Sequence, residues 1–96
     1  EAAIDAVTAI SGSGPAYFFL LAEALEEAAC TLGLPATTAA MLARRTLAGA
    51  GAMIASDDRS PAALRCAVTS PGGTTESALK VLDGDQQLVR RLVKDA

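Results

Sequence analysis

The sequence contains no histidine and no tryptophan, and it has only two cysteines, two phenylalanines and one tyrosine in 96 residues. Without histidine, the Ser–His and Cys–His pairs that activate nucleophiles cannot form within this chain. A zinc site would need an unusual ligand set, because Cys30 and Cys66 lie far apart in the sequence. We therefore expect no metal, and we interpret both cysteines as small buried apolar residues in a reducing cytoplasm.

Basic residues are scarce as well. The net charge is −3, and Arg44-Arg45 and Arg90-Arg91 are the only basic pairs, so we exclude nucleic-acid binding. The apolar run from Ala28 to Ala43 is interrupted by Gly33 and Pro35, which argues against a membrane span. The chain opens without an initiator methionine or a signal-peptide pattern, and both ends read as cuts inside a longer cytoplasmic protein.

Small apolar residues dominate what is present: 51% of the residues are hydrophobic but only 3% are aromatic. A core of alanine and leucine buries little area per side chain. We therefore expect this single domain, residues 1–96, to need a partner surface for stability. No stretch alternates apolar and polar residues as strands do, so the predicted class is all-α, a bundle of about five helices, two long and three short.

The helices are expected at residues 16–32, 36–55, 61–69, 75–82 and 85–93, after a short helical lead-in over residues 1–10. Ser11-Gly12-Ser13-Gly14-Pro15 should break the helical pattern, with Ser13 or Gly14 capping the next helix. Ser60 and Asp85 are the expected caps of two later helices. Gly49 and Gly51 lie inside the second long helix at a cost of about 1 kcal/mol each, which predicts the close approach of another helix or a ligand.

Two glycine- and hydroxyl-rich turns are the only features suited to chemistry. In Ser70-Pro71-Gly72-Gly73-Thr74-Thr75, the glycines allow backbone conformations that residues with side chains avoid. Thr74 or Thr75 can then cap the following helix, with Glu76 in its first turn. Unpaired N–H groups at such a helix start suit a small anion such as a carboxylate.

The earlier turn, residues 11–15, is not a dinucleotide fingerprint, because no strand precedes it and Tyr17 stands where a third glycine belongs. The clustered carboxylates Glu23/Glu26/Glu27 and Asp57/Asp58 are interpreted as solvated rather than catalytic.

Together, the two turns resemble the C-terminal domain of pyrroline-5-carboxylate reductase. The resemblance covers the stretch from Asp5 to Tyr17, the Gly33-Leu34-Pro35 corner, and the stretch from Ala67 to Asp83. It implies a dimerisation and substrate domain whose N-terminal Rossmann domain is absent from this chain, so that the isolated chain is inactive. It further implies hydride transfer from NADPH or NADH to 1-pyrroline-5-carboxylate, giving L-proline, in a cytoplasmic homodimer of interlocking helices or a larger ring.

The resemblance also assigns roles to residues. The substrate carboxylate would be held by the main chain at Gly73 and Thr74 with the Ser70 hydroxyl, and the Thr75 hydroxyl would bond the ring nitrogen and assist its protonation. Thr75 is thus the expected catalytic residue. The substrate-binding set is Ser70, Gly72, Gly73, Thr74 and Thr75. Ser11, Gly12, Ser13 and Gly14 would lie near the nicotinamide. The charge of Glu76, one residue after Thr75, could repel the substrate carboxylate, and Glu76 is expected to point to solvent, as the first turn of a helix permits.

Two alternatives remain open. The chain could be a helical dimerisation module without a ligand site, as its alanine-rich helices permit. It could also be the helical domain of a related imine or hydroxyacid reductase.

Overall fold

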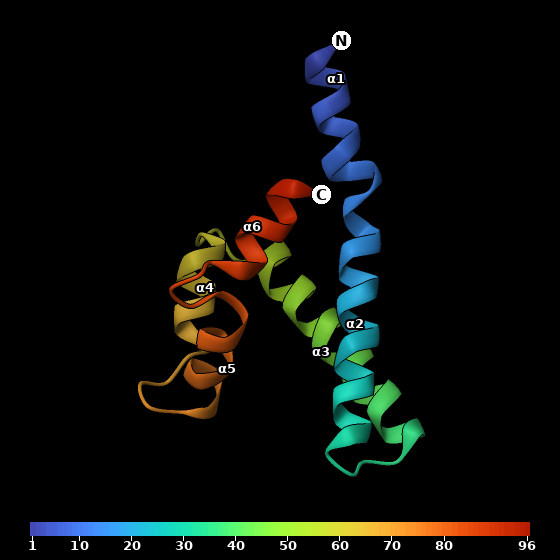
Figure 1. Ribbon diagram of the computed structural model, residues 1–96, viewed down its shortest axis with the longest axis vertical. Coiled ribbons are helices and arrows are strands. Elements are labelled where there is room, and N and C mark those ends of the chain that lie inside the picture. The colour runs from blue at the N-terminus through green and yellow to red at the C-terminus, as the bar shows by residue number, and fades with distance from the viewer. The chain divides into compact units, whose positions relative to one another are not determined.

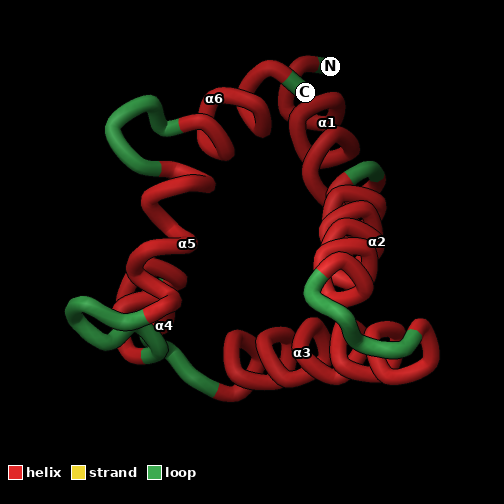
Figure 2. The backbone as a smooth tube through the Cα atoms, turned by 60° about the horizontal axis from the view of Figure 1, so that its bottom comes forward, coloured by secondary structure: helices red, strands yellow, loops and turns green.

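The computed structural model describes residues 1–96, and every regular element in it is helical (Figures 1 and 2). The elements are α1 (Ala2–Val7), a π-helical turn η1 (Thr8–Gly12), α2 (Gly14–Thr31), α3 (Ala36–Ser56), α4 (Pro61–Ala67), α5 (Thr74–Asp83) and α6 (Leu88–Asp95). The all-α prediction is confirmed, with two long and three short helices when Ala2–Thr31 is counted as one. The chain divides into two compact units, Glu1–Ser56 and Asp57–Ala96.

The first unit begins with α1, η1 and α2, which follow one another in a single helical stretch (Figure 1). The predicted break at residues 11–15 is therefore wrong: the chain widens into a π-turn instead of leaving the helix. Pro15 is tolerated in the first turn of α2, where its missing N–H costs little. By length and composition alone, the stretch Ala2–Thr31 could cross a membrane, a property that core helices of soluble proteins share.

A tight corner turns the chain from α2 into α3. Gly33 adopts a φ of +100°, which a residue without a Cβ reaches at low cost. Its N–H donates to the carbonyl of Cys30 at 3.0 Å, and the N–H of Leu34 donates to the carbonyl of Ala29 at 3.1 Å. This pair of bonds is the Schellman motif, which satisfies the last carbonyls of a helix. The predicted helix end at Gly33 is confirmed.

Alanine makes the contact between α2 and α3 close. Ala39 and Ala43, one turn apart on α3, are 1% and 5% exposed, and α3 packs against α2. Small side chains at this spacing let two helices approach closely. In the whole chain, Leu64 is the only other buried hydrophobic residue, so the expected core of small apolar residues is present but thin.

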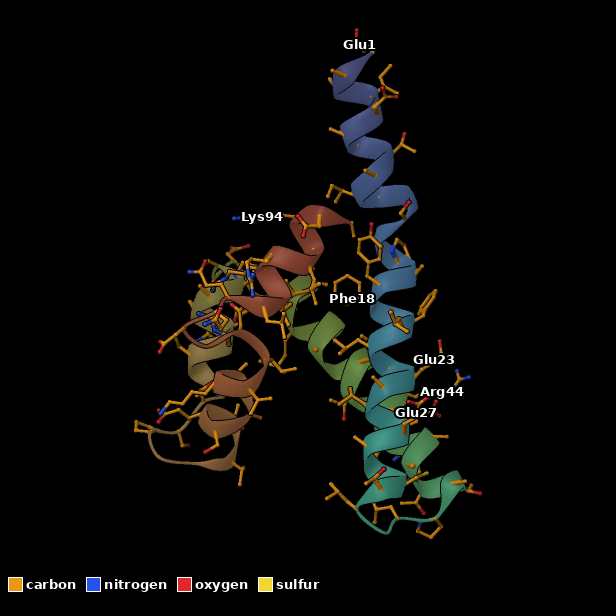
Figure 3. All side chains as sticks on the ribbon, viewed as in Figure 1. Glu1, Phe18, Glu23, Glu27, Arg44 and Lys94 are labelled. Atoms are coloured by element: carbon orange, nitrogen blue, oxygen red, sulfur yellow. The ribbon has the colours of Figure 1, made fainter.

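Large apolar side chains lie on the outside of α1, η1 and α2. Ile10 is 71% exposed and Leu20 is 65% exposed, and Phe18 extends from α2 in Figure 3. The prediction of buried cysteines is also wrong, because Cys30 and Cys66 are both free thiols on exposed residues. A helix face of this kind gains stability only when another surface covers it.

The second unit opens with a short loop and a capped helix. The carboxylate of Asp57 accepts from the guanidinium of Arg59 and, with a smaller effect, from its backbone N–H, and these bonds hold the pKa of Asp57 below its usual value. The Ser60 hydroxyl then accepts from the N–H of Ala63 at 3.1 Å, and Pro61 occupies the first turn of α4. The predicted Ser60 cap is therefore confirmed.

Asp83, and not Asp85, caps α6. Its Oδ1 accepts from the N–H of Arg90 at 3.0 Å, and its Oδ2 lies 3.1 Å from Arg90 Nε. Gln87 stands at the N-cap position in a left-handed conformation (φ 49°), with no side-chain cap of its own. The prediction of Asp85 as the cap is wrong. The loop between α5 and α6 folds back, so that Asp83, the last residue of α5, lies at the start of α6.

This cap gives a stability prediction. We expect Asp83→Ala to lower the free energy of unfolding by about 1 kcal/mol, since it removes the only acceptor for an α6 amide. Asp85→Ala, two residues further along the same loop, should change it by less than about 0.5 kcal/mol. Urea unfolding of both variants at one protein concentration would measure the difference. Equal effects of the two substitutions would contradict the cap assignment.

Candidate functional site

The turn that joins α4 to the first two residues of α5, residues 69–75, begins by closing the end of α4. The N–H of Thr69 donates to the carbonyl of Cys66 at 3.1 Å, and its hydroxyl donates to the carbonyl of Arg65 at 2.6 Å. The first bond satisfies a carbonyl group at the helix end, whereas the Arg65 carbonyl also accepts from the N–H of Val68 at 3.3 Å. The Thr69 hydroxyl is thus occupied within the chain.

Residues 70–73 then form a tight reverse turn. The N–H of Gly73 donates to the carbonyl of Ser70 at 3.1 Å, and Gly72 adopts a φ of +74°. Proline at the second position and positive φ at the third position are typical of a type II turn. A Cβ at Gly73 would lie 3.2 Å from the carbonyl oxygen of Ser70. The two glycines therefore have separate roles: Gly72 supplies the backbone conformation, and Gly73 supplies the space.

The start of α5 is left uncapped. Gly73 is the N-cap, and no side chain accepts from the first amides of the helix. The prediction that Thr74 or Thr75 caps this helix is wrong, because both are already its first two residues. The first backbone bond at this end runs from the N–H of Ser77 to the carbonyl of Gly73 at 3.3 Å. The amides of Thr74, Thr75 and Glu76 consequently have no acceptor in the chain.

This arrangement suits a small anion. Free N–H groups at the start of a helix combine with the helix dipole to attract negative charge. The hydroxyls of Ser70, Thr74 and Thr75 belong to exposed residues and take part in no hydrogen bond within the chain, in contrast to that of Thr69. Sequence reasoning assigned the main-chain contacts to Gly73 and Thr74. In the structure, the N–H of Gly73 already donates to Ser70 within the turn, so it is not available to a ligand. The N–H of Glu76, which was not predicted, is free instead.

Glu76 lies at the flank of α5, in its first turn as expected. Its side chain is 39% exposed, and its Oε1 lies 3.7 Å from Nζ of Lys80. It lines an open groove of about 270 Å³. The groove is lined by Arg65, Thr69, Glu76, Leu79, Lys80, Asp83, Gly84 and Arg90. The carboxylate is therefore partly in solvent, as expected, but it also faces cations that sequence reasoning did not connect with it.

The second predicted site, Ser11 to Gly14, lies in the first unit and differs from the expected helix-opening turn. Ser13 has helical dihedral angles and caps nothing, and its N–H donates to the carbonyl of Thr8 at 3.3 Å. The Ser11 hydroxyl donates to the carbonyl of Val7 at 2.8 Å. A continuous helical backbone offers no row of free amides here. These residues therefore do not form a phosphate cradle, although Ser11, Gly12 and Ser13 are exposed and small enough to let a flat ring approach.

The first unit also contains a groove between α2 and α3, of about 470 Å³. It is lined by Phe19, Ala22, Glu23, Glu26, Ala40, Ala43, Arg44, Leu47 and Ala48. Glu23 and Arg44 are labelled on this pair of helices in Figure 3. No group of three or more Cys, Asp or Glu side chains is placed to hold a metal ion.

Comparisons with known proteins agree with one another. The family model described as pyrroline-5-carboxylate reductase dimerisation matches residues 1–96. A pyrroline-5-carboxylate reductase of Pseudomonas aeruginosa is 51% identical over all of this chain and 36% of its own length. One from Arabidopsis thaliana is 46% identical over 86% of this chain and 30% of its own length. A crystal structure of the Plasmodium falciparum pyrroline carboxylate reductase with NADP bound matches 96% of this chain and 34% of its own, with a TM-score of 0.85 and 33% identity.

Proposed function

The chain belongs to the pyrroline-5-carboxylate reductase dimerisation family, and from this membership we propose that it is the substrate and dimerisation part of an enzyme that forms L-proline. The reaction is the reduction of 1-pyrroline-5-carboxylate by NADPH or NADH, in a cytoplasmic homodimer. The chain spans about a third of the length of the curated relatives it matches. The remaining length is available for a domain that binds the cofactor.

The observation that carries this proposal is the uncapped start of α5. The amides of Thr74 and Thr75 and the hydroxyl of Ser70 bind the ring carboxylate, beside the turn that Gly72 and Gly73 shape. A carboxylate bound by charge-assisted bonds at a helix start is fixed in orientation as well as position. The five-membered ring is thereby held with its imine in a defined direction.

Thr75 then acts at the ring nitrogen. Its hydroxyl makes no bond within the chain, so it is available to hydrogen-bond the nitrogen and to assist its protonation as the C=N carbon is reduced. When bound, the reduced nicotinamide supplies the hydride. Orientation is the main contribution of this chain to the reaction, and such positioning accounts for much of catalysis in cofactor enzymes.

Residues 11–14 fit a secondary role toward the cofactor. The π-turn has no free amide row, so it is unsuited to the pyrophosphate. Its small exposed residues Ser11, Gly12 and Ser13 suit contact with the nicotinamide end, while Gly14, which is buried, shapes the backbone beneath them. The phosphates would be bound outside this chain.

Subunit association explains other features of the helices. A Cβ at Gly49 or at Gly51 would meet nothing within 4 Å in this chain, so the close approach predicted at these glycines is not made within the chain. The apolar exposed side chains of α2 need a cover as well. We propose that a second copy supplies both, and that the stretch Ala2–Thr31 is covered by protein and not by lipid.

A dimerisation module without a ligand site is the second candidate, favoured by the extent of exposed apolar surface alone. Two measurements separate these candidates. The full-length protein should oxidise NADPH or NADH only when 1-pyrroline-5-carboxylate is present, as followed by the absorbance of the reduced nicotinamide. L-proline should shift the amide resonances of Thr74, Thr75 and Glu76. A protein that dimerises but shows neither turnover nor shifted resonances would be the module.

A further inference from the structure

Glu76 occupies a position from which it could block the start of its own helix. It is the third residue of α5, where a glutamate commonly folds back toward the N-cap. The free amides of Thr74 and Thr75 attract any carboxylate nearby. The carboxylate of Glu76 is therefore an internal competitor for the place that the substrate carboxylate takes in the proposed function.

The structure shows Glu76 turned along the helix instead. Its Oε1 lies 3.7 Å from Lys80 Nζ, one turn further from the amides. It also lines the groove on the flank of α5, and Arg65 lines the same groove. The N–H of Gly73, which a glutamate at this position would normally reach, is already donated to Ser70. The carboxylate of Glu76 therefore lies beside a cation and not at the start of the helix.

Lys80 is the cation that Glu76 uses. Arg90 is paired with Asp83, at 3.1 Å between Nε and Oδ2, so it is neutralised within the groove. Arg65 lines the same groove and forms no ion pair in this chain. Lys80 is 74% exposed and contributes little to stability as a surface pair. Its effect is on where the glutamate lies.

We propose that Lys80 is a positioning residue for substrate binding: by pairing with Glu76, it keeps that carboxylate away from the amides that receive the substrate. This inference rests on the proposed function. It assigns to Lys80 no contact with substrate or cofactor. Its effect is carried entirely by Glu76, so the removal of Glu76 should also remove the need for Lys80.

The test is a mutant cycle in the full-length enzyme, with KM for 1-pyrroline-5-carboxylate as the readout. Lys80→Gln should raise KM about 3- to 10-fold at low ionic strength, with kcat unchanged, because a freed carboxylate competes with the substrate. The double variant Lys80→Gln/Glu76→Gln should return KM to within about 2-fold of the wild-type value. Lys80→Arg, which retains the cation, should behave as wild type.

Lys94→Gln is the matched control. It removes the same charge from the other lysine of this chain, in α6, and should leave KM unchanged. A Lys80→Gln variant with the KM of this control would overturn the inference. So would a double variant as impaired as Lys80→Gln alone, since a general loss of charge or fold would not depend on Glu76. Absence of turnover in the wild-type enzyme would instead refute the proposed function itself.

Discussion

Replacing Thr75 with alanine in the full-length enzyme is expected to lower kcat for 1-pyrroline-5-carboxylate by about 100-fold, the scale on which a positioned proton donor contributes. The hydroxyl of Thr75 is free of bonds within the chain, so its loss should affect the reaction and not the fold. Affinity for NADPH should be unchanged if, as proposed, the cofactor phosphates are bound outside this chain. Steady-state kinetics and a fluorescence titration with NADPH would measure both quantities.

Thr69→Ala is the control for this substitution. Thr69 lies in the same turn, but its hydroxyl donates to the carbonyl of Arg65 at 2.6 Å and is therefore not available to a ligand. Its loss should cost some stability and leave kcat within about 2-fold of the wild-type value. Unchanged turnover in Thr75→Ala would remove Thr75 from the mechanism, whatever the control does.

The second large effect is expected in subunit association. Leu20 is 65% exposed on α2, in a part of the helix that is apolar all round. Burying a leucine contributes about 1.5–3 kcal/mol, and a symmetric interface repeats that contribution. Leu20→Glu also places an unpaired carboxylate in the interface. We expect the dissociation constant of the proposed dimer to rise at least about 100-fold, as measured by sedimentation equilibrium.

Glu27→Gln provides a comparison on the same helix. It removes one charge from the clustered carboxylates Glu23, Glu26 and Glu27 of α2. It should alter the dissociation constant by less than about 3-fold, as expected of a surface charge. If Leu20→Glu associates as tightly as Glu27→Gln, this part of α2 is not covered by a second copy, and the assignment of the interface fails.

Local backbone chemistry made much of the fold predictable. Gly33 before Pro35 indicated the corner between the long helices, and Ser60-Pro61 indicated the start of α4; the hydrogen bonds at both places confirm these predictions. The turn at residues 70–73 was also recognisable, because proline followed by glycine has few backbone solutions. In each case the residues that determine the structure are neighbours in the sequence.

The features that sequence analysis missed are of two kinds. Some residues are compatible with two local backbone conformations, and some contacts form only because the chain folds back on itself. Ser11 to Pro15 is compatible with a break or with a π-turn, and sequence alone does not select the π-turn that forms. Asp83 caps α6 from seven residues away, where a local rule favours Asp85. The pairing of Glu76 with Lys80 follows helical spacing. Its importance becomes visible only once the amides of Thr74 and Thr75 are known to be free.

The thin interior has a consequence for how this protein responds to its surroundings. With only Ala39, Ala43 and Leu64 shielded among the hydrophobic residues, and with a second copy covering α2 as proposed, we expect folding and dimerisation to form a single mass-action equilibrium. The midpoint of thermal denaturation should then rise with protein concentration. Dilution below the dissociation constant of the proposed dimer should then favour the unfolded chain.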